Sequence, residues 1–262
     1  MENTTVRGWV SSGIRVLRGS ENRVENSTVE QTRFHGIVVE ESSDTLVSGC
    51  TVRQSGYEVT ASTGDGIVVF GGHDNRIEHS LVEQSHHHGI HVGDGEHDTL
   101  IVDNVSQYNG GDGLYFCWNV LRATVRGNDF HHNARHGIGS LGIGGDKGDR
   151  LNLVVGNVSR QNGVYGIEAV GGRANTIEDN VVLDNSQAAP GRYAGILLLD
   201  TLETTVRGNR SGGDAAPYAQ RFGILETGRS DRNSITGNLC EGNGEAGVQI
   251  VGPLTFASGN VG

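Results

Sequence analysis

Short runs of alternating apolar and polar residues recur along the whole chain, and glycine and asparagine separate them. A glycine followed by an aliphatic residue marks ten successive repeats, from Gly13-Ile14 to Gly247-Val248, at spacings of 23 to 30 residues. Alternation with a period of two is typical of a half-buried β-strand. Each repeat is therefore predicted to contain short strands that end at Gly and Asn turns.

A second pattern lies between these glycines and is clearest in residues 123–133, 175–185 and 233–243. When the repeats are aligned on it, one position holds Ser27, Cys50, Ser80, Asn104, Asn128, Asn157, Asn180, Asn209, Asn238 and Asn260. We expect the side chains at this position to face inward and to hydrogen-bond from one repeat to the next. Cys50 is then expected to be a buried, unreactive thiol.

A repeat of this length cannot bury an apolar face alone and must stack on copies of itself. No unit offers ten helix-compatible residues, which disfavours leucine-rich and helical repeats. The predicted fold is all-β, a right-handed parallel β-helix (solenoid) of about ten coils and about 48 Å in height, with residues 1–262 as one domain. Because the repeat begins and ends within a coil, we expect a homo-oligomeric partner or further chain segments to cover the ends.

Composition narrows the classes of partner. The net charge of -11 argues against non-specific binding to nucleic acid or to anionic membranes, and no apolar run reaches the roughly 18 residues of a membrane span. The N-terminus has no signal-peptide pattern, so a cytoplasmic location is expected unless the sequence is trimmed. Cys50, Cys117 and Cys240 form neither a disulfide framework nor a zinc motif.

Two columns of residues beside the repeated glycine carry the candidate chemistry. The residue after the aliphatic one should face solvent, and its column reads Arg15, Val38, Val68, His91, Tyr115, Gly139, Glu168, Leu197, Leu225 and Gln249. The residue before the glycine gives Ser12, His35, Asp65, His88, Asp112, His136, Tyr165, Ala194, Phe222 and Ala246. Because an inward stack of His and Asp would be costly to bury, we expect this second column to be exposed at the edge of a groove.

All eleven histidines lie between His35 and His136, which predicts a site on the fourth to sixth coils. The plainer interpretation is that these are solvated turn residues multiplied by repeat duplication. No motif demands a zinc site, which needs three or four converging ligands, so we expect acid–base chemistry and no resident metal. Calcium remains an option in residues 144–149, where Asp146 and Asp149 would supply only part of the roughly six to eight oxygens that it takes.

Two short segments resemble motifs of a known family. Asn109-Gly110-Gly111-Asp112-Gly113 and Arg135-His136-Gly137 resemble motifs on successive coils of the catalytic module of alginate (mannuronan) C-5 epimerases, and more broadly of β-helix enzymes and lyases acting on uronic-acid polysaccharides. The resemblance covers residues 83–262 and implies a polysaccharide or oligosaccharide substrate. Where the family has Tyr-Gly-Phe-Asp-Pro-His, this chain has His88-Gly89-Ile90-His91-Val92-Gly93, and the family's helical cap and lysine-bearing coil have no counterpart.

Such enzymes remove a proton beside a carboxylate, which needs a group that neutralises the carboxylate, a base and an acid. The candidate catalytic residues are His88, His91 and His136 as bases, Tyr115 as acid and Asp112 as the carboxylate that orients a histidine. The candidate substrate-binding residues are Arg135, which would pair with the substrate carboxylate, Asp65, Tyr165 (also an alternative acid), Glu168, Arg192 and Arg221.

Three alternatives stay open. Asp65 and Asp112 lie two coils apart, about 9.6 Å between backbones, which is near the carboxyl separation of inverting glycoside hydrolases, although His88 lies between them. A non-catalytic glycan-binding solenoid would use the same columns for contact alone. The third alternative is a small-molecule isomerase or cyclase, since a fold does not fix a function.

Overall fold

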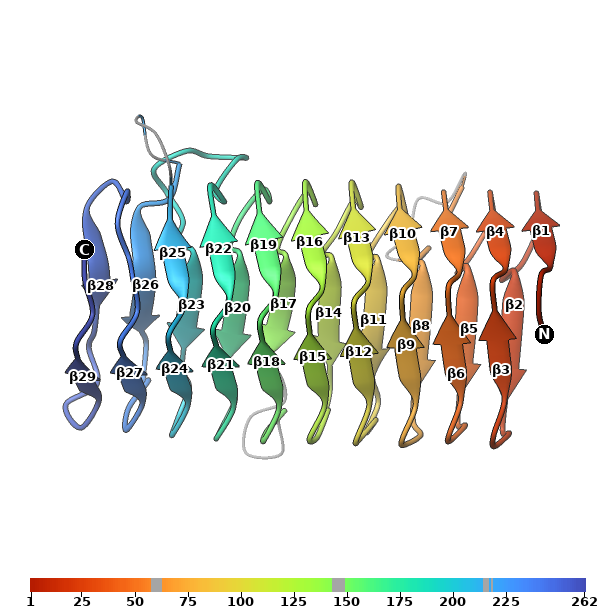
Figure 1. The fold of residues 1–262 in the computed structure, drawn as a ribbon, viewed down its shortest axis with the longest axis horizontal. Helices are drawn as coiled ribbons and strands as arrows, with labels where there is room; N and C mark the ends of the chain where they lie inside the picture. The colour runs from red at the N-terminus through yellow and green to blue at the C-terminus, as the bar shows by residue number, and fades with distance from the viewer. Residues whose placement is uncertain (58–62, 143–148, 214–216, 218) are drawn as a thin grey trace.

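The chain winds into a solenoid of parallel strands, three to a coil (Figure 1). The structure is a computed structural model that describes residues 1–57, 63–142, 149–213, 217 and 219–262. Every regular element in these residues is a β-strand. None of them forms a helix with the length and apolarity that a membrane crossing requires. The fold is a right-handed parallel β-helix of about ten coils, as the repeat predicts.

Three sheets run the length of the solenoid. Sheet 1 contains β1 (Thr5–Arg7), β4 (Thr28–Glu30), β7 (Thr51–Arg53), β10 (Leu81–Glu83), β13 (Val105–Gln107), β16 (Asp129–His131), β19 (Val158–Arg160), β22 (Val181–Leu183) and β25 (Arg210–Gly212). Sheet 2 contains β2 (Ile14–Leu17), β5 (Ile37–Glu40), β8 (Ile67–Phe70), β11 (Ile90–Gly93), β14 (Leu114–Cys117), β17 (Ile138–Leu141), β20 (Ile167–Val170), β23 (Ile196–Leu199), β26 (Phe222–Thr227) and β28 (Ala246–Gln249). Sheet 3 contains β3 (Arg23–Glu25), β6 (Leu46–Ser48), β9 (Arg76–Glu78), β12 (Leu100–Val102), β15 (Thr124–Arg126), β18 (Leu153–Val155), β21 (Thr176–Glu178), β24 (Thr205–Arg207), β27 (Ser234–Thr236) and β29 (Phe256–Ser258).

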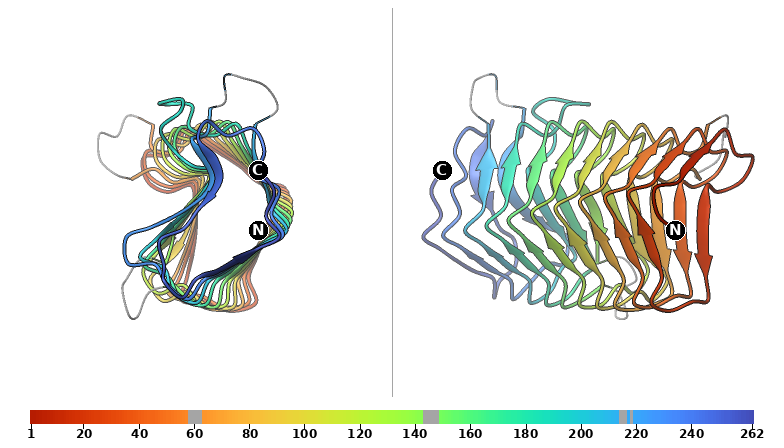
Figure 2. Two further views of the ribbon diagram at one scale, coloured as in Figure 1. Left: turned by 90° about the vertical axis from the view of Figure 1, so that its left-hand side faces the viewer. Right: turned by 45° about the vertical axis from the view of Figure 1, so that its right-hand side comes forward.

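Each strand pairs with the same strand of the next coil, so equivalent residues of successive repeats stack on one another. Viewed along the long axis, the coils superimpose on one another (Figure 2). In sheet 2, for example, His91 is in register with Val68 on one side and with Tyr115 on the other. This register confirms the alignment of the repeats on the Gly-aliphatic pair.

The apolar core lies between the three sheets and is built from the inward-facing residues of each strand. In sheet 3 the central residue of almost every strand is buried: Val24, Val47, Ile77, Ile101, Val125, Val154, Ile177, Val206 and Ile235. All strands but the six-residue β26 are only three or four residues long, and alternate residues of a strand face opposite sides of the sheet. Each coil therefore buries its apolar side chains mainly against the coils above and below it.

The predicted asparagine column is an internal ladder. The backbone N–H of Asn104 donates to Asn128 Oδ1 (2.9 Å), and that of Asn128 donates to Asn157 Oδ1 (3.0 Å). The same bond links Cys50 to Ser80. Cys50 is buried as predicted, and burial raises the pKa of its thiol.

Two further ladders occupy the other turns of the coil and were not predicted. The turn between sheets 1 and 2 carries Ser85, Asn109, Asn133, Asn162, Asn185 and Gln220. The turn between sheets 2 and 3 carries shorter stretches, such as Asn152 with Asn175. These side chains satisfy buried backbone N–H groups where the strands end.

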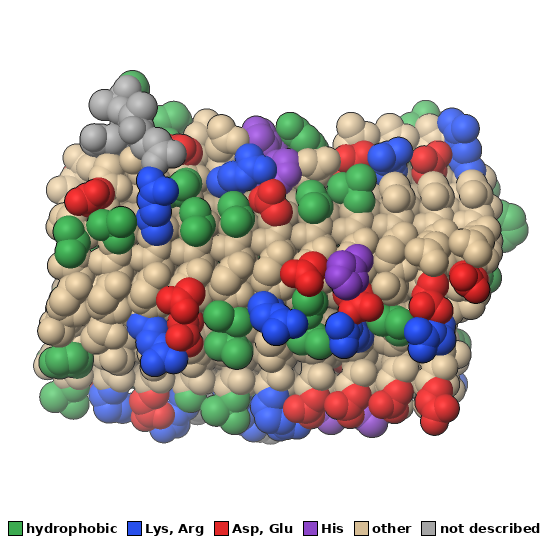
Figure 3. Space-filling model, viewed as in Figure 1, with side chains coloured by type: hydrophobic (Ala, Val, Ile, Leu, Met, Phe, Trp, Pro, Cys, Tyr) green, Lys and Arg blue, Asp and Glu red, His purple; other side chains and the backbone are tan. Residues whose placement is uncertain are grey.

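The face formed by sheets 1 and 3 carries rows of charged side chains, with acidic groups beside basic ones (Figure 3). Arg53 lies 2.6 Å from Glu83 in sheet 1, and Arg207 lies 2.8 Å from Glu178 in sheet 3. These partners come from neighbouring coils, so the arginines are neutralised within the solenoid. The predicted chemistry lies instead on sheet 2.

Candidate functional site

The two predicted columns meet on the outer face of sheet 2 and on the turn that leads into it. The column after the aliphatic residue is in register from Arg15 to Gly139. Its expected exposure is wrong in part, because Val38, Val68 and Leu197 are buried. Strands of one sheet lie only about 4.8 Å apart, so outward side chains of adjacent coils cover one another.

The central part of the column before the glycine is buried, so the prediction that this column is exposed is wrong there, whereas His35 and Tyr165 are partly exposed. His88, Asp112 and His136 have exposed fractions of 1%, 0% and 3%, and Asp65 is buried as well. Sequence reasoning counted the cost of burying these groups but not their hydrogen bonds. Each side chain accepts the backbone N–H of the equivalent residue on the next coil, which offsets the loss of water.

These bonds form a continuous series that we call the His–Asp ladder: His35, Asp65, His88, Asp112, His136 and Tyr165. The acceptor–donor distances are 3.2 Å from His35 Nδ1 to the N–H of Asp65, then 2.9, 3.0, 2.9 and 3.2 Å for the following steps to Tyr165. The side chains of the His–Asp ladder therefore accept backbone N–H groups of the next coil, as asparagine side chains do in the other ladders.

The ladder sets the protonation of its two central histidines. Nδ1 of His88 and Nδ1 of His136 accept a backbone N–H, so a neutral ring carries its proton on Nε2. Burial lowers the pKa of both histidines, although Asp112 opposes it. Nε2 of His136 lies 3.5 Å from Glu168 Oε1. At neutral pH these rings are thus uncharged, and their second nitrogen is a hydrogen-bond donor.

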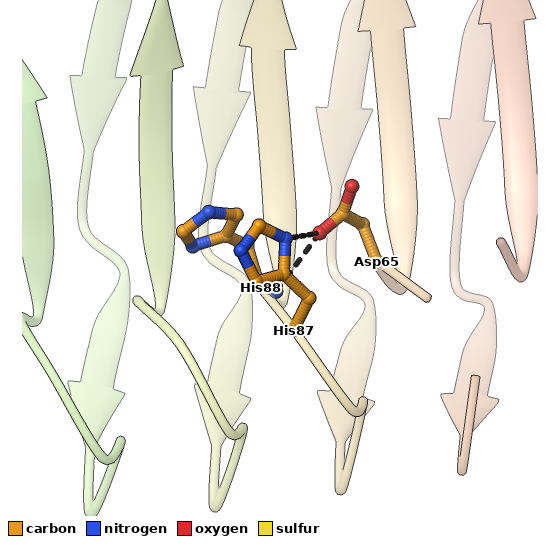
Figure 4. Close-up of side chains that lie close together, drawn as sticks. All are labelled: Asp65, His87 and His88. Atoms are coloured by element: carbon orange, nitrogen blue, oxygen red, sulfur yellow. Dashed lines mark hydrogen bonds and ion pairs between the residues drawn. The ribbon is translucent and has the colours of Figure 1, made fainter. Parts of the chain in front are cut away.

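Asp65 is the centre of the first half of the site (Figure 4). Its Oδ1 accepts hydrogen bonds from His87 Nδ1 and from the backbone N–H of His88, both at 2.9 Å. Its Oδ2 accepts from His91 Nδ1, also at 2.9 Å. Burial acts to raise the pKa of Asp65, but the contacts with His35, His87 and His91 outweigh it and hold the pKa well below its usual range.

His91 presents the opposite nitrogen from His88. Because a carboxylate can only accept, Nδ1 of His91 must carry the proton that it donates to Asp65, and Nε2 then presents a lone pair. This Nε2 is buried and has no hydrogen-bond partner among the described residues. The ring lies edge-on to Phe70 and Tyr115, at centroid distances of 4.7 and 5.0 Å. A histidine oriented by a carboxylate, with its other nitrogen free, is suited to accept a proton.

Tyr115 contacts both His88, whose Nδ1 accepts a hydrogen bond, and His91, whose Nδ1 donates one. Its ring stacks on His88 at 4.2 Å between centroids and 2° between planes. Burial raises the pKa of its phenol, and a hydrogen bond with Ser140 acts in the opposite direction. Ser140 has a φ of 56° at a register shift between β17 and β20, which is a β-bulge beside the site. The phenol stays protonated at neutral pH and can donate a proton.

Asp112 joins this cluster to the second half of the site. Its Oδ2 lies 3.2 Å from His88 Nδ1 and 3.9 Å from Arg135 Nη1. The same oxygen is buried without a hydrogen-bond partner in the part of the chain that the structure describes. Burial acts to raise the pKa of Asp112, but His88, His136 and Arg135 lower it overall.

Gly139 makes room for this carboxylate. A Cβ on Gly139 would lie 2.6 Å from Asp112 Oδ2 and 2.7 Å from its Cγ. In the sequence, Gly139 is visible only as the position of the outward column that lacks a side chain. Two residues of the site were also missed: His87, whose signal was its place in the run His86-His87-His88, and Ser140, which no pattern marked.

The predicted arginines lie at different distances from the His–Asp ladder, of which Tyr165 is the last member. Arg135 is half exposed beside Asp112, and Tyr165 stacks on His136 at 5.3 Å. Arg192 lies over the ring of Tyr193, which contacts Tyr165 edge-on at 5.2 Å. Arg221 is paired with Glu245 at 2.7 Å and has no contact with the His–Asp ladder among the described residues.

One group among the described residues brings three potential metal ligands together: Asp65, His87 and His88, with one candidate atom each within 4.8 Å of the others. Asp65 Oδ1 already accepts two N–H groups there, so this carboxylate fits better as the group that orients a histidine than as a ligand. The proposed calcium segment lies mostly outside the described residues, at 144–148. Asp149, which is described, accepts the N–H groups of Val120 and Gly142.

The chain matches the family of right-handed beta helix regions over residues 1–145, 61–211 and 118–252. No curated protein matches it. Among solved structures it is similar to the A-module of mannuronan C-5 epimerase AlgE4 from Azotobacter vinelandii, with a TM-score of 0.77 and 20% identity over 99% of this chain and 78% of that one.

Two other solved structures show the same likeness. The periplasmic alginate epimerase AlgG has a TM-score of 0.73 and 14% identity over 98% of this chain and 74% of its own. The Dettilon tailspike protein has a TM-score of 0.74 and 17% identity over 99% of this chain and 58% of its own. At these identities the likeness establishes the fold.

Proposed function

Because this chain belongs to the family of right-handed beta helices, we propose that it is a β-helix enzyme that acts on a uronate-containing polysaccharide or oligosaccharide. The proposed reaction removes the proton beside the sugar carboxylate, as a C-5 epimerase or a lyase does. The observation that carries the proposal is His91, whose Nδ1 is bound to Asp65 and whose buried Nε2 has no partner among the described residues. The names of the alginate epimerases of similar fold support the class of substrate.

In the proposed mechanism the ring of His91 moves when substrate binds, so that Nε2, which is buried in the free protein, takes the proton from C-5 of the uronate. The C–H electron pair moves into the carboxylate, which becomes a dianionic enediolate, and the imidazolium of His91 is stabilised by Asp65 at 2.9 Å. Holding the ring in one orientation before the reaction removes the cost of arranging it in the transition state.

Tyr115 supplies the acid in this mechanism. Its phenol is adjacent to His91 and remains protonated at neutral pH, because burial raises its pKa. The ring of Tyr115 contacts that of His91 at 5.0 Å and so lies on the same face of the sugar, whereas an epimerase must return a proton to C-5 from the opposite face; the phenol proton therefore suits a lyase better. In a lyase it goes to the oxygen of the glycosidic bond at C-4, which leaves as the double bond forms.

The charge that develops on the carboxylate requires donors. Arg135 is the guanidinium nearest to the site, and its half-exposed side chain can turn from Asp112 toward a bound anion. His136 Nε2–H offers a neutral donor beside it. A bidentate guanidinium contact is the usual way in which proteins bind carboxylates.

Hydrolysis by Asp65 and Asp112 is the weaker alternative. An inverting glycoside hydrolase needs one carboxyl that holds a proton near neutral pH, which requires a raised pKa. The pKa of Asp65 and that of Asp112 are both lowered, and Asp65 is occupied by three N–H donors. Neither carboxyl is therefore suited to be the acid.

The proposal is tested by incubating the protein in D₂O with polymannuronate, polygalacturonate and a glucuronate polymer. Deuterium at C-5 without chain cleavage indicates an epimerase, and ultraviolet absorbance of unsaturated chain ends indicates a lyase. The His91→Gln and Tyr115→Phe variants should lose about 10²–10⁴-fold in rate. His79→Gln, an exposed histidine away from sheet 2, is the control and should keep full activity.

Other outcomes point to the alternatives. New reducing ends without deuterium or unsaturation would indicate a hydrolase. Binding of a polymer without any turnover would indicate a glycan-binding solenoid. Wild-type rates in His91→Gln would remove His91 from the mechanism.

A further inference from the structure

Two shallow hollows lie on the turn between sheets 1 and 2, at the N-terminal side of the catalytic cluster. The first is lined by Gln54, Ser55, Gly56, Tyr57, Gln84 and His86. The second is lined by Gly8, Trp9, Val10, Gln31, Arg33 and Tyr57. Tyr57 borders both, so the two hollows are adjacent along the solenoid.

These hollows continue the line of the catalytic residues. The N–H of Arg33 donates to the carbonyl of Trp9 (2.9 Å), and the N–H of His86 donates to the carbonyl of Ser55 (2.8 Å). The same turn thus carries the hollows on coils one to four, and His87 follows directly in sequence. At a rise of about 4.8 Å per coil, Trp9 and His86 are about 14 Å apart along the axis, which several linked sugar rings would span.

The side chains that border the hollows suit a carbohydrate. Trp9 and Tyr57 are 55% and 53% exposed. Their flat aromatic surfaces are therefore open to solvent, and this exposure does not stabilise the fold. Aromatic rings pack against the apolar face of a sugar ring. The amides of Gln31, Gln54 and Gln84 offer both donors and acceptors to sugar hydroxyls.

Arg33 adds a selective charge. Its side chain is exposed and forms no ion pair with any described residue, whereas Arg18, Arg53 and Arg173 are paired with glutamates at 2.6, 2.6 and 2.8 Å. In a chain with a net charge of -11, Arg33 thus brings to the second hollow a guanidinium that no described carboxylate neutralises. A guanidinium pairs bidentately with a carboxylate, which a uronate residue carries.

We propose that these two hollows are binding subsites for a uronate chain that extends from the catalytic residues toward the N-terminal coils. Trp9 and Tyr57 stack on sugar rings, and Arg33 pairs with a sugar carboxylate. The inference rests on the proposed function for its choice of sugar. It adds a direction to the bound chain and a dependence on chain length.

The experiment measures binding directly, by calorimetric titration of trimers and octamers of mannuronate and of galacturonate. Trp9→Ala, Tyr57→Ala and Arg33→Gln should each weaken the Kd for an octamer roughly tenfold, which corresponds to about 1.4 kcal/mol. The Kd for a trimer should not change, because a trimer fits at the catalytic residues alone. Trp118→Ala is the matched control, since Trp118 is 54% exposed on the turn after β14.

The outcomes separate this inference from the proposed function. Octamer binding that weakens in the three variants supports the subsites even if no deuterium exchange occurs. Unchanged octamer affinity in Trp9→Ala and Tyr57→Ala overturns them even if exchange occurs. No octamer binding by the wild type, or equal binding of a neutral glucan octamer that is insensitive to Arg33→Gln, overturns the uronate assignment. Thermal melting of each variant establishes that it is folded.

Discussion

His88 and His91 are three residues apart, and their Nδ1 atoms have opposite roles in hydrogen bonding. Nδ1 of His88 accepts the N–H of Asp112, and Nδ1 of His91 donates to Asp65. One free nitrogen is therefore a donor and the other an acceptor, although both rings are neutral. A proton donor and a proton acceptor in one cluster is what proton abstraction and return require.

The first prediction concerns the orientation of His91. In Asp65→Asn the new amide NH₂ donates where the carboxylate accepted, so either His87 or His91 must change tautomer. We expect turnover to fall about 10²–10⁴-fold, with a smaller change in KM, as measured by initial rates on the uronate polymer that the wild type modifies.

The control for this change is Asp98→Asn. Asp98 also pairs with a histidine, His97 at 2.8 Å, but on the opposite turn of the coil. It should leave turnover unchanged. Normal turnover in Asp65→Asn, with NMR showing the Nε2-protonated form of His91, would contradict the assigned role.

The second prediction concerns the pH dependence of stability. Burial lowers the pKa of His88 and of His136 in the folded protein, whereas histidine in an unfolded chain titrates near about 6.5. Below that pH the unfolded chain binds more protons, so stability falls as the pH drops from neutral. Thermal melting between about pH 7.5 and pH 5 should show this decline.

His136→Asn tests the cause. Asparagine can still accept the N–H of Tyr165, which His136 Nδ1 accepts at 3.2 Å, but it does not titrate. Its melting temperature should fall less steeply with pH than that of the wild type, whereas the exposed control His79→Asn should keep the wild-type slope. The lowered pKa of Asp65 and of Asp112 matters only below about pH 4, where their unfolded forms take up protons.

The positions of these residues in the coil could be predicted from the sequence, but their burial and their hydrogen bonds could not. The alternation of His and Asp along one column, and the register of His91 with Tyr115, followed from the repeat. The burial of Asp112 could not be predicted in this way. A hydrogen bond from a backbone N–H of the next coil offsets the free-energy cost of burying its carboxylate. The choice of ring nitrogen depends on those same backbone bonds, so no pattern of residue types could reveal it.

Among the elements, β17 departs from the regular pattern. The register between β17 and β20 shifts between Ile138 and Leu141, and Ser140 has a positive φ. At the bulge the N–H of Ser140 donates to Glu168 Oε2 (3.2 Å), and Gly139 leaves space for the carboxylate of Asp112. The irregular strand β17 therefore determines how the side chains of the site pack against one another.

The third prediction concerns this strand. Gly139→Ala places a Cβ 2.6 Å from Asp112 Oδ2, so the buried carboxylate must move away from His88 and Arg135. We expect a loss of about 1–3 kcal/mol in the free energy of unfolding and a large loss of turnover. Denaturant unfolding and rate measurements check both.

Gly244→Ala is the comparison, because a Cβ there meets only ordinary contacts at 3.5 and 3.8 Å. It should change neither quantity appreciably. A Gly139→Ala protein with wild-type turnover would show that Asp112 tolerates displacement.

The element pattern was predictable where the repeat is regular. One asparagine ladder was visible from the sequence because its residues keep a constant offset from a valine or isoleucine. The ladder through Asn109, Asn133 and Gln220 was missed although most of its members follow those of the first ladder at a constant offset of five residues; only Gln220 is preceded by an insert and replaces Asn. The bulge at Ser140 had no signal, because Gly-Ser is compatible with a regular strand.

For the whole molecule, stability follows from nearest-neighbour contacts between coils. Strands in the middle of each sheet have two neighbours, and the first and last strands have one. All three residues of β29 are exposed, whereas the central residue of β15 is buried. Stability should therefore decrease toward both ends of this chain.

The fourth prediction is a gradient of amide hydrogen exchange. Amides of β11, β14 and β17 should exchange most slowly, and those of β1 and β29 most rapidly, in hydrogen–deuterium exchange read by mass spectrometry. The His–Asp ladder and its neighbours would then lie on the most protected coils. Uniform exchange along the chain would instead indicate that the solenoid opens as one cooperative unit.

The His–Asp ladder also bears on how such a site can change over generations. Each position needs only a side-chain acceptor for one backbone N–H, and histidine, aspartate and asparagine all provide it. The codons for His, Asp, Asn and Tyr differ from one another only in their first base. A single nucleotide change at any ladder position can thus add, remove or invert a charge while the backbone bond to the next coil survives, or end the ladder at a tyrosine as at Tyr165. Reactive groups can shift along the axis one coil at a time without a new fold.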